Sequence, residues 1–143
     1  MKSMKLTIGT DQFVRRMSGQ ISGPIYFEFA DGSFFPERGW FDFPITIMSW
    51  RSRDLALASG EFDLSFMEGN CRLRVSSEPG SPSKIIPFWG SLPEGHQDKG
   101  YAIDLESFKE LTVGSWEQIS TYPSLDDEES RMVTTCIGRL TEN

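Results

Sequence analysis

The sequence predicts an α+β fold, with a mainly antiparallel sheet of five or six strands and two or three helices packed on it. Short segments of alternating apolar and polar residues come in pairs joined by turn residues, which is typical of hairpins. Two other segments, near residue 50 and near the C-terminus, carry apolar residues at helical spacing. A chain of 143 residues is long enough for one core, so residues 1–143 should form a single α+β domain.

The first hairpin is expected at residues 24–29, which read PIYFEF and place Ile, Phe and Phe on one face. Asp31 and Gly32 then supply the two residues that tolerate positive φ in a type I′ turn. Pro36 removes a ladder donor, so the return strand should be short or lie at an edge. Weaker strand candidates precede this hairpin at residues 5–8 and 12–17.

Residues 39–50 read GWFDFPITIMSW, which fits a strand by alternation and a helix by its three- and four-residue spacing. The flanks favour a helix from about residue 44 to residue 58. Asp42 is a good N-cap, Pro44 falls in the first turn, where its missing N–H costs nothing, and Gly60 follows as a C-cap.

One face of this helix should pack on the sheet, and its apolar stripe is Phe43, Ile47, Trp50 and Leu57. We therefore expect Trp50 to be buried together with apolar strand residues, namely Phe27, Phe29, Leu64, Phe66 and Leu73. Asp54 falls within the stripe, where an unpaired carboxylate is costly to bury, so it should pair with an arginine or be exposed.

A second hairpin is expected from the alternating residues 61–66 and 71–75, joined by a loop that contains glycine. Residues 84–89 should form a further strand, and Pro87 places that strand at an edge or a bulge. Residues 101–103 are one more strand candidate, and residues 104–111 have the cap and spacing of a short helix.

The chain should end in a helix that follows Pro123, with Ser124 at its capped start. Acidic residues fill the first turn, as the helix dipole favours. Apolar residues then repeat at helical spacing: Met132, Cys136, Ile137 and Leu140.

The charge is unevenly distributed along the chain, which has a formal net charge of −7 and a pI near 4.7. Residues 1–60 hold seven basic and six acidic residues, whereas residues 61–143 hold seven and fifteen. Nucleic acid is therefore a poor partner for it. The acidic half has two readings, a solvated surface or a surface that steers a basic protein partner into contact. The residues proposed for that contact are Glu94, Asp98, Asp104, Glu106, Glu110 and Glu117.

The sequence has no recognisable catalytic, metal or cofactor motif. The single histidine, His96, lies in a polar loop, and the two cysteines lack the paired spacing of zinc ligands. We expect no enzyme activity and no cofactor. The rival hypothesis is a small hydrolase or isomerase that uses Asp42, Asp54 or His96 beside the first helix.

No apolar run approaches the length that crosses a bilayer, and the N-terminus lacks the apolar stretch of a secretory signal. We therefore expect a cytoplasmic protein. The aromatic residues of GWFDFPITIMSW should mainly anchor the helix, although Trp40 and Phe41 would serve as binding anchors if they are exposed. In that case the alternative function is a small-molecule-binding module.

Several landmarks between about residues 25 and 75 resemble small bacterial immunity proteins of contact-dependent inhibition and polymorphic toxin systems. They are an aromatic hairpin, Trp40 and Asp42 before a helix that carries Trp50, then Gly60 and the FMEG turn of residues 66–69. The resemblance implies an acidic, cytoplasmic, non-catalytic inhibitor that binds a cognate toxin domain, often a basic nuclease. It assigns no binding residue, because the contact surfaces of these proteins differ from member to member.

Overall fold

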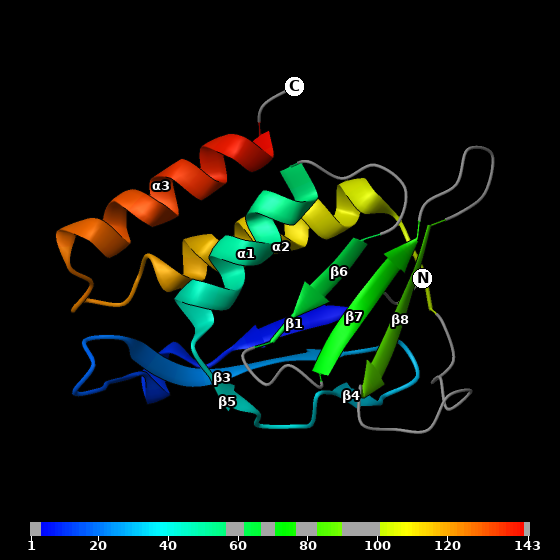
Figure 1. The fold of residues 1–143 in the computed structure, drawn as a ribbon, viewed down its shortest axis with the longest axis horizontal. Coiled ribbons are helices and arrows are strands. Elements are labelled where there is room, and N and C mark those ends of the chain that lie inside the picture. The colour runs from blue at the N-terminus through cyan, green and yellow to red at the C-terminus, as the bar shows by residue number, and fades with distance from the viewer. Residues whose placement is uncertain (1–3, 57–61, 67–70, 77–82, 90–100, 142–143) are drawn as a thin grey trace.

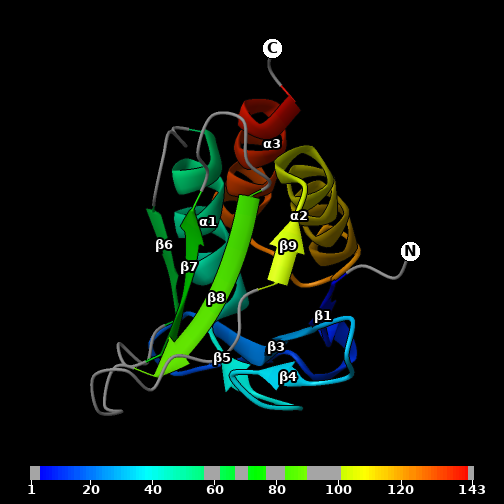
Figure 2. The ribbon, with the colours of Figure 1, turned by 90° about the vertical axis from the view of Figure 1, so that its right-hand side faces the viewer.

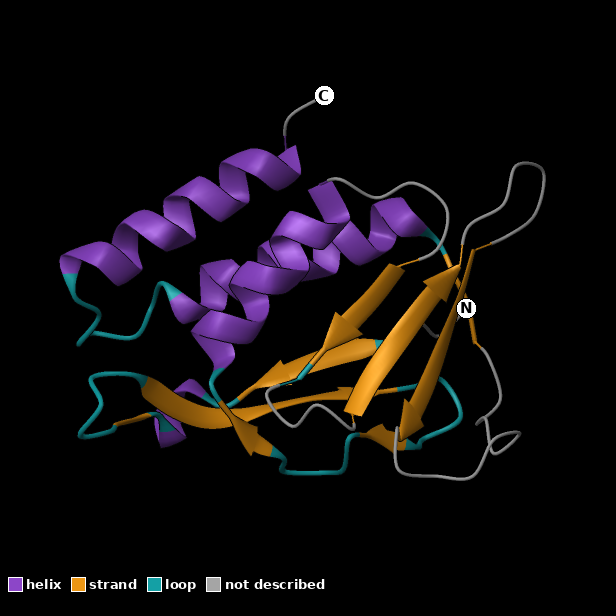
Figure 3. Ribbon diagram, viewed as in Figure 1, coloured by secondary structure: helices purple, strands orange, loops and turns teal. Residues whose placement is uncertain are grey.

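The computed structural model describes residues 4–56, 62–66, 71–76, 83–89 and 101–141. Within these ranges, three α-helices and two antiparallel sheets confirm the predicted α+β class (Figures 1 and 3). The strands are β1 (Lys5–Ile8), β2 (Val14–Arg15), β3 (Ile21–Glu28), β4 (Phe34–Phe35), β5 (Phe41–Asp42), β6 (Phe62–Ser65), β7 (Cys71–Ser76), β8 (Ser83–Trp89) and β9 (Tyr101–Ile103). The helices are α1 (Pro44–Ala56), α2 (Leu105–Ile119) and α3 (Asp127–Thr141), and a 3-10 turn, η1, spans Thr10–Gln12.

The first sheet is built around β3, which pairs with all four other strands of that sheet. Strand β1 pairs along one edge of β3, with Leu6 opposite Phe27, and β4 pairs at the same level with Phe35 opposite Phe27. Further along β3, β2 pairs with the same edge as β1, and β5 pairs with the same edge as β4. The second sheet has the order β6-β7-β8-β9, so β9 lies at one edge.

The helices cover the sheets on one side, in two layers. Helix α1 packs on β3 and β6, and α2 packs on β1, so these two helices lie against the strands. Helix α3 packs on α1 and α2 and forms the outer layer (Figure 1). None of the helices in the described part of the chain is long and apolar enough to cross a membrane.

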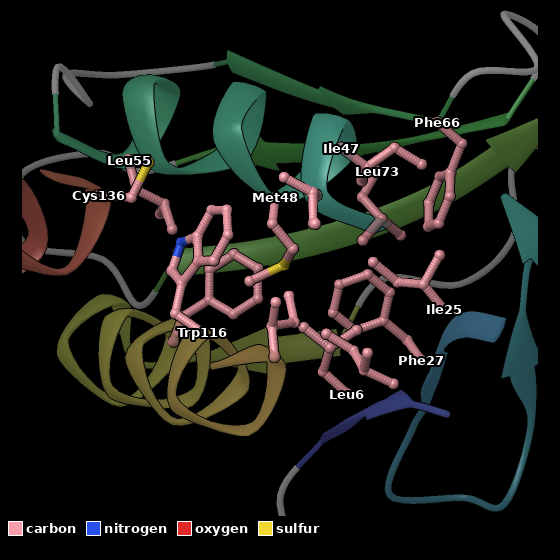
Figure 4. Packing of buried hydrophobic residues seen from close by; sticks show 14 of the residues in the cluster. Leu6, Ile25, Phe27, Ile47, Met48, Leu55, Phe66, Leu73, Trp116 and Cys136 are labelled. Carbon is pink, nitrogen blue, oxygen red and sulfur yellow. The ribbon is translucent and has the colours of Figure 1, made fainter. Parts of the chain in front are cut away.

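A continuous apolar cluster draws on both sheets and all three helices (Figure 4). Phe27 of β3 lies 6.3 Å from Phe66, the residue after β6, and 6.2 Å from Phe108 of α2, measured between ring centroids. Trp116 of α2 is fully buried and its indole N–H donates to Ser52 of α1 at 2.7 Å. These contacts hold the two sheets and two of the helices together.

The first hairpin forms as predicted, but its turn is different. No non-glycine residue in the described ranges has a positive φ, so Asp31 does not occupy a type I′ position. The amide of Gly32 (φ 89°) donates to Phe29 and the amide of Phe29 donates to Ser33. This is a three-residue loop with glycine at the position of positive φ.

The second hairpin forms as predicted, and its register places Leu64 opposite Leu73, with an ion pair of 3.0 Å between Asp63 and Arg74. Strand β8 pairs with β9 only as far as Ile85. Pro87 lies beyond that point and therefore at an edge among the described strands, as predicted.

Helix α1 begins at Pro44 as predicted, but it turns a different face to the core. Trp50 is only half-buried, so the prediction that it is buried was wrong. The buried positions of the helix include two polar residues: Ile45, Ile47, Met48, Arg51, Ser52 and Leu55. Of the strand residues expected in the core, Phe27, Phe29, Phe66 and Leu73 are buried, and the side chain of Leu64 lies outside the described ones.

Helices α2 and α3 also differ in detail from expectation. Helix α2 is capped by Asp104 but runs to Ile119, eight residues beyond the predicted end. Helix α3 is capped by Asp126 rather than Ser124. The amide of Glu129 donates to Asp126 and the amide of Asp126 donates to Glu129, at 2.8 and 2.9 Å, which is a reciprocal capping box.

Candidate functional site

Helix α2 is positioned by its N-terminal cap and its buried face. The Asp104 carboxylate accepts the backbone N–H of Glu106 at 3.3 Å and the hydroxyl of Ser107 at 2.9 Å, which fixes the first turn. The buried face packs on the core and consists of Phe108, Thr112, Ser115, Trp116 and Ile119. The opposite face of the helix is therefore exposed.

Acidic residues follow that exposed face. We call Asp104, Glu106, Glu110 and Glu117 the α2 ridge; all four are exposed. Because a helix turns once every 3.6 residues, the three glutamates lie within a narrow stripe along its axis. Lys109 approaches Glu106 to 3.9 Å. A pair this exposed contributes little, so the ridge keeps most of its negative charge.

Two hollows flank the α2 ridge. The first, which we call the seam pocket, has a volume of about 700 Å³. Its lining comes from β9, the first turns of α2, the residue before β1 and the residues after β3, and Figure 2 shows how these elements are arranged. Its lining among the described residues is largely apolar: Met4, Phe29, Ala30, Tyr101, Ala102, Ile103, Phe108 and Leu111, with Asp104, Ser107 and Glu110.

The second hollow, the α2–α3 groove, has a volume of about 570 Å³. Val113 and Leu140 contribute apolar surface to it, while Glu106, Glu110 and Glu117 contribute negative charge and Lys109 contributes one positive charge. Glu110 therefore lines both hollows. The arrangement places carboxylates around apolar depressions, which suits the recognition of a basic group attached to an apolar body.

Four of the eight residues predicted to bind a partner are brought together in this site, as the α2 ridge. Glu94 and Asp98 lie outside the described residues. Trp40 and Phe41 belong to the other side of the first sheet, where β5 pairs with the edge of β3 opposite β1. They line neither of the two hollows.

Trp40 and Phe41, the two aromatic residues predicted to bind a partner, differ in their exposure. Trp40 is half-buried, and its indole N–H donates to Asp42 Oδ2 at 2.8 Å. Phe41 is 48% exposed. Only Phe41 thus offers a large accessible aromatic surface.

Of the three residues of the rival enzyme hypothesis, Asp42 is the one whose side chain the structure describes. Asp42 is buried, and its second oxygen accepts the backbone N–H of Phe43 at 2.9 Å, so its carboxylate orders the entry to α1. It is not the N-cap, because the first intrahelical bond of α1 is accepted by Phe43. The side chain of Asp54 and all of His96 lie outside the described residues.

No group of histidine, cysteine and acidic residues that could hold a metal ion occurs among the described side chains. Cys136 is a buried free thiol on α3. Burial raises the pKa of Cys136, and a contact with Ser52 opposes that shift. A thiol with a raised pKa is a weak nucleophile at neutral pH, so Cys136 is a core residue.

No protein-family model, curated protein or solved structure matches this chain.

The sequence did not indicate the apolar residues of the seam pocket. Met4, Phe29, Tyr101 and Leu111 come from four separate segments that meet only in the folded chain. The available signal was the acidic first turn of α2 next to a predicted strand at residues 101–103. That pattern places carboxylates at the junction of the two elements, but it does not place the segments that complete the pocket.

Proposed function

We propose that this chain is a non-catalytic protein-binding domain whose α2 ridge docks a basic partner. The observation that carries the proposal is the position of Glu110 on the ridge, between two hollows that combine apolar surface with carboxylates. Protein interfaces commonly have an apolar centre that supplies the short-range energy and a polar rim that remains hydrated. The ridge and its two hollows have both components.

The negative charge of the α2 ridge should mainly affect the rate at which a partner associates. Carboxylates on one exposed helix face attract a basic surface over about a Debye length, roughly 8–10 Å at physiological salt, and so raise the association rate. The apolar hollows act after contact, when partner side chains enter them and water leaves. Affinity should therefore fall as salt rises, mainly through a slower association rate.

The most specific form of the proposal is an immunity protein that blocks a basic toxin domain in the cytoplasm. It is supported by the landmark resemblance of residues 25–75, by the acidic second half of the chain and by the α2 ridge. In this mechanism the chain binds the toxin and covers its active surface, and it needs no reactive group of its own.

The test uses the protein encoded directly before this chain, because an immunity gene follows its toxin in such systems. That protein is expressed in a bacterial host with and without this chain, and growth is measured. Purified proteins are then mixed, and the association rate is measured at several salt concentrations. We expect this chain to protect the host and the association rate to fall as salt rises.

Charge-reversal variants locate the contact. Glu110→Lys should lower the association rate about tenfold at low salt, because it replaces attraction with repulsion at the centre of the ridge. Glu37→Lys is the matched control, because it makes the same change in net charge. Glu37 is exposed in the loop between β4 and β5. Equal effects of the two variants would refute the ridge as the contact. Absence of both protection and binding would refute the toxin as the partner.

A further inference from the structure

The seam pocket has a preformed aromatic wall. The rings of Phe29 and Tyr101 are parallel, with an interplanar angle of 6° and a centroid distance of 4.2 Å. The Tyr101 hydroxyl donates to Asp31 at 3.0 Å and lies 2.9 Å from the hydroxyl of Ser33. Because Tyr101 is held at its ring and at its hydroxyl, the wall exists before any ligand enters.

The other walls are largely apolar and can pack against the apolar part of an organic ligand. Met4 precedes β1, Ile103 ends β9, and Phe108 and Leu111 belong to α2. Phe108 is 2% exposed. A volume of about 700 Å³ lies in the range of pockets that bind small organic molecules, roughly 300–1,000 Å³. It also accommodates a basic side chain of a partner together with a neighbouring residue.

The charge of the pocket has one sign. Asp104 and Glu110 supply two carboxylates, and the described lining residues include no lysine, arginine or histidine. An aromatic face and a carboxylate are the two groups that attract an ammonium or guanidinium ion most strongly in proteins. An anionic ligand would instead meet repulsion from both carboxylates.

Among the described surroundings of the pocket, the N-terminus of α2 would favour an anion, because the helix dipole is positive there. One of the backbone N–H groups at this helix end already donates a hydrogen bond within the chain. The backbone N–H of Glu106 donates to the Asp104 carboxylate, so this amide is not available to an external anion. The same bond holds the Asp104 carboxylate at the rim of the pocket.

We propose that the seam pocket binds an organic cation, with its charged group beside Asp104 and Glu110 and its apolar body against Tyr101 and Leu111. The cation is either a free amine or a basic side chain of the protein partner. In the second case the inference rests on the proposed function, but its test needs no partner and can fail or succeed separately.

The test compares probes that share a phenylethyl body and differ in charge: phenethylammonium, 2-phenylethanol and 3-phenylpropanoate. Each is added at millimolar concentration to the full chain with labelled methyl groups, and the NMR signals of Met4, Ile103 and Leu111 are followed. We expect the ammonium probe to bind most tightly, the alcohol about two- to fivefold more weakly and the carboxylate most weakly. The preference for the ammonium probe should decline as salt rises.

A second arm distinguishes the two sources of the cation. A capped tripeptide with lysine between leucine and phenylalanine is compared with the same peptide carrying norleucine in place of lysine. Tighter binding of the lysine peptide than of phenethylammonium assigns the pocket to a protein partner. Tighter binding of the free amine assigns it to a small molecule.

Substitutions at the rim assign the charge preference to the pocket. Glu110→Gln should reduce the affinity for phenethylammonium about two- to fivefold and leave that for 2-phenylethanol unchanged, because only the ion uses the carboxylate. Glu37→Gln, on the opposite side of the first sheet, is the matched control and should change neither. Equal affinities for the three probes, or no shift of the three methyl signals with any probe or peptide, would overturn the proposal.

Discussion

The guanidinium carbon of Arg51 lies 4.8 Å from the ring centroid of Phe27. The same group lies 5.6 Å from the ring of Phe66, and Arg51 is only 1% exposed. Phe27 belongs to the first sheet and Phe66 follows β6 of the second, so an arginine from α1 lies against aromatic rings from both sheets. A planar cation near aromatic rings is stabilised most when it is shielded from water, as it is here.

Replacing Arg51 should therefore destabilise the fold. Arg51→Ala removes the ring contacts and leaves a cavity, which we expect to lower the free energy of unfolding by about 2–4 kcal/mol. The control is Arg53→Ala on the exposed side of the same helix, which should change it by less than about 0.5 kcal/mol. Urea unfolding followed by circular dichroism measures both. Similar losses for the two variants would show that the stacking contributes little.

Trp116, rather than Trp50, should be the energetically important tryptophan. Trp116→Ala removes a fully buried ring and the hydrogen bond to Ser52, and we expect a loss of about 3–5 kcal/mol. Trp50→Ala should cost clearly less, because Trp50 is only half-buried. Both are measured by urea unfolding followed by circular dichroism. The reverse order would contradict the packing of α1 and α2 described above.

The capping box of α3 should make a measurable contribution to stability. Asp126→Ala removes the acceptor for the Glu129 amide, with an expected loss of about 0.5–2 kcal/mol. Glu129 also accepts from Arg15 of β2 at 2.8 Å, and this bond raises the pKa of Arg15. The control is Asp127→Ala, a neighbouring acidic residue in the first turn, which should cost less. Thermal unfolding of both variants compares their stabilities. An equal loss of stability would mean that the charge near the helix dipole, and not the capping hydrogen bond, is responsible.

Burial of Cys136 should make the stability of the chain decrease at alkaline pH. The folded state raises the pKa of the thiol, so above its ordinary value of about 8.5 the unfolded chain loses this proton before the folded chain does. Stability from this group is complete below pH 8 or so and declines as pH rises towards the raised pKa. In Cys136→Ala that part of the decline should vanish. Urea unfolding of both proteins at a series of pH values tests this, and parallel curves would contradict it.

Local signals determined much of the fold from the sequence. Alternating residues and a glycine-containing loop indicated the second hairpin and which of its residues share a face, because successive side chains of a strand point to opposite faces. Pro44 marked the start of α1, because proline is tolerated only in the first turn of a helix. The cap at Asp104 and the spacing after it predicted the first turns of α2, which carry Glu106 and Glu110, while Glu117 was singled out by charge alone. Each of these depends on neighbours in sequence.

The buried face of α1 was decided by the tertiary structure. Arg51 and Ser52 are polar, so a sequence pattern assigns them to solvent and gives the core position to Trp50. In the folded chain Arg51 meets Phe27 and Phe66, and Ser52 accepts from Trp116. Those partners are distant in sequence, and they make the burial of two polar side chains favourable.

The length of α2 and the shape of the seam pocket were decided in the same way. The second half of α2 contains Gly114 and buried polar residues such as Thr112, which weaken a helical pattern, yet Trp116 and Ile119 anchor it in the core. The seam pocket exists because separate segments stop short of filling the space between the start of β1, the end of β3, β9 and α2. The sequence by itself therefore determined the elements and the charge of the ridge. Packing between distant segments decided which faces are buried and where the pocket lies, because those faces and that space are defined only when the segments meet.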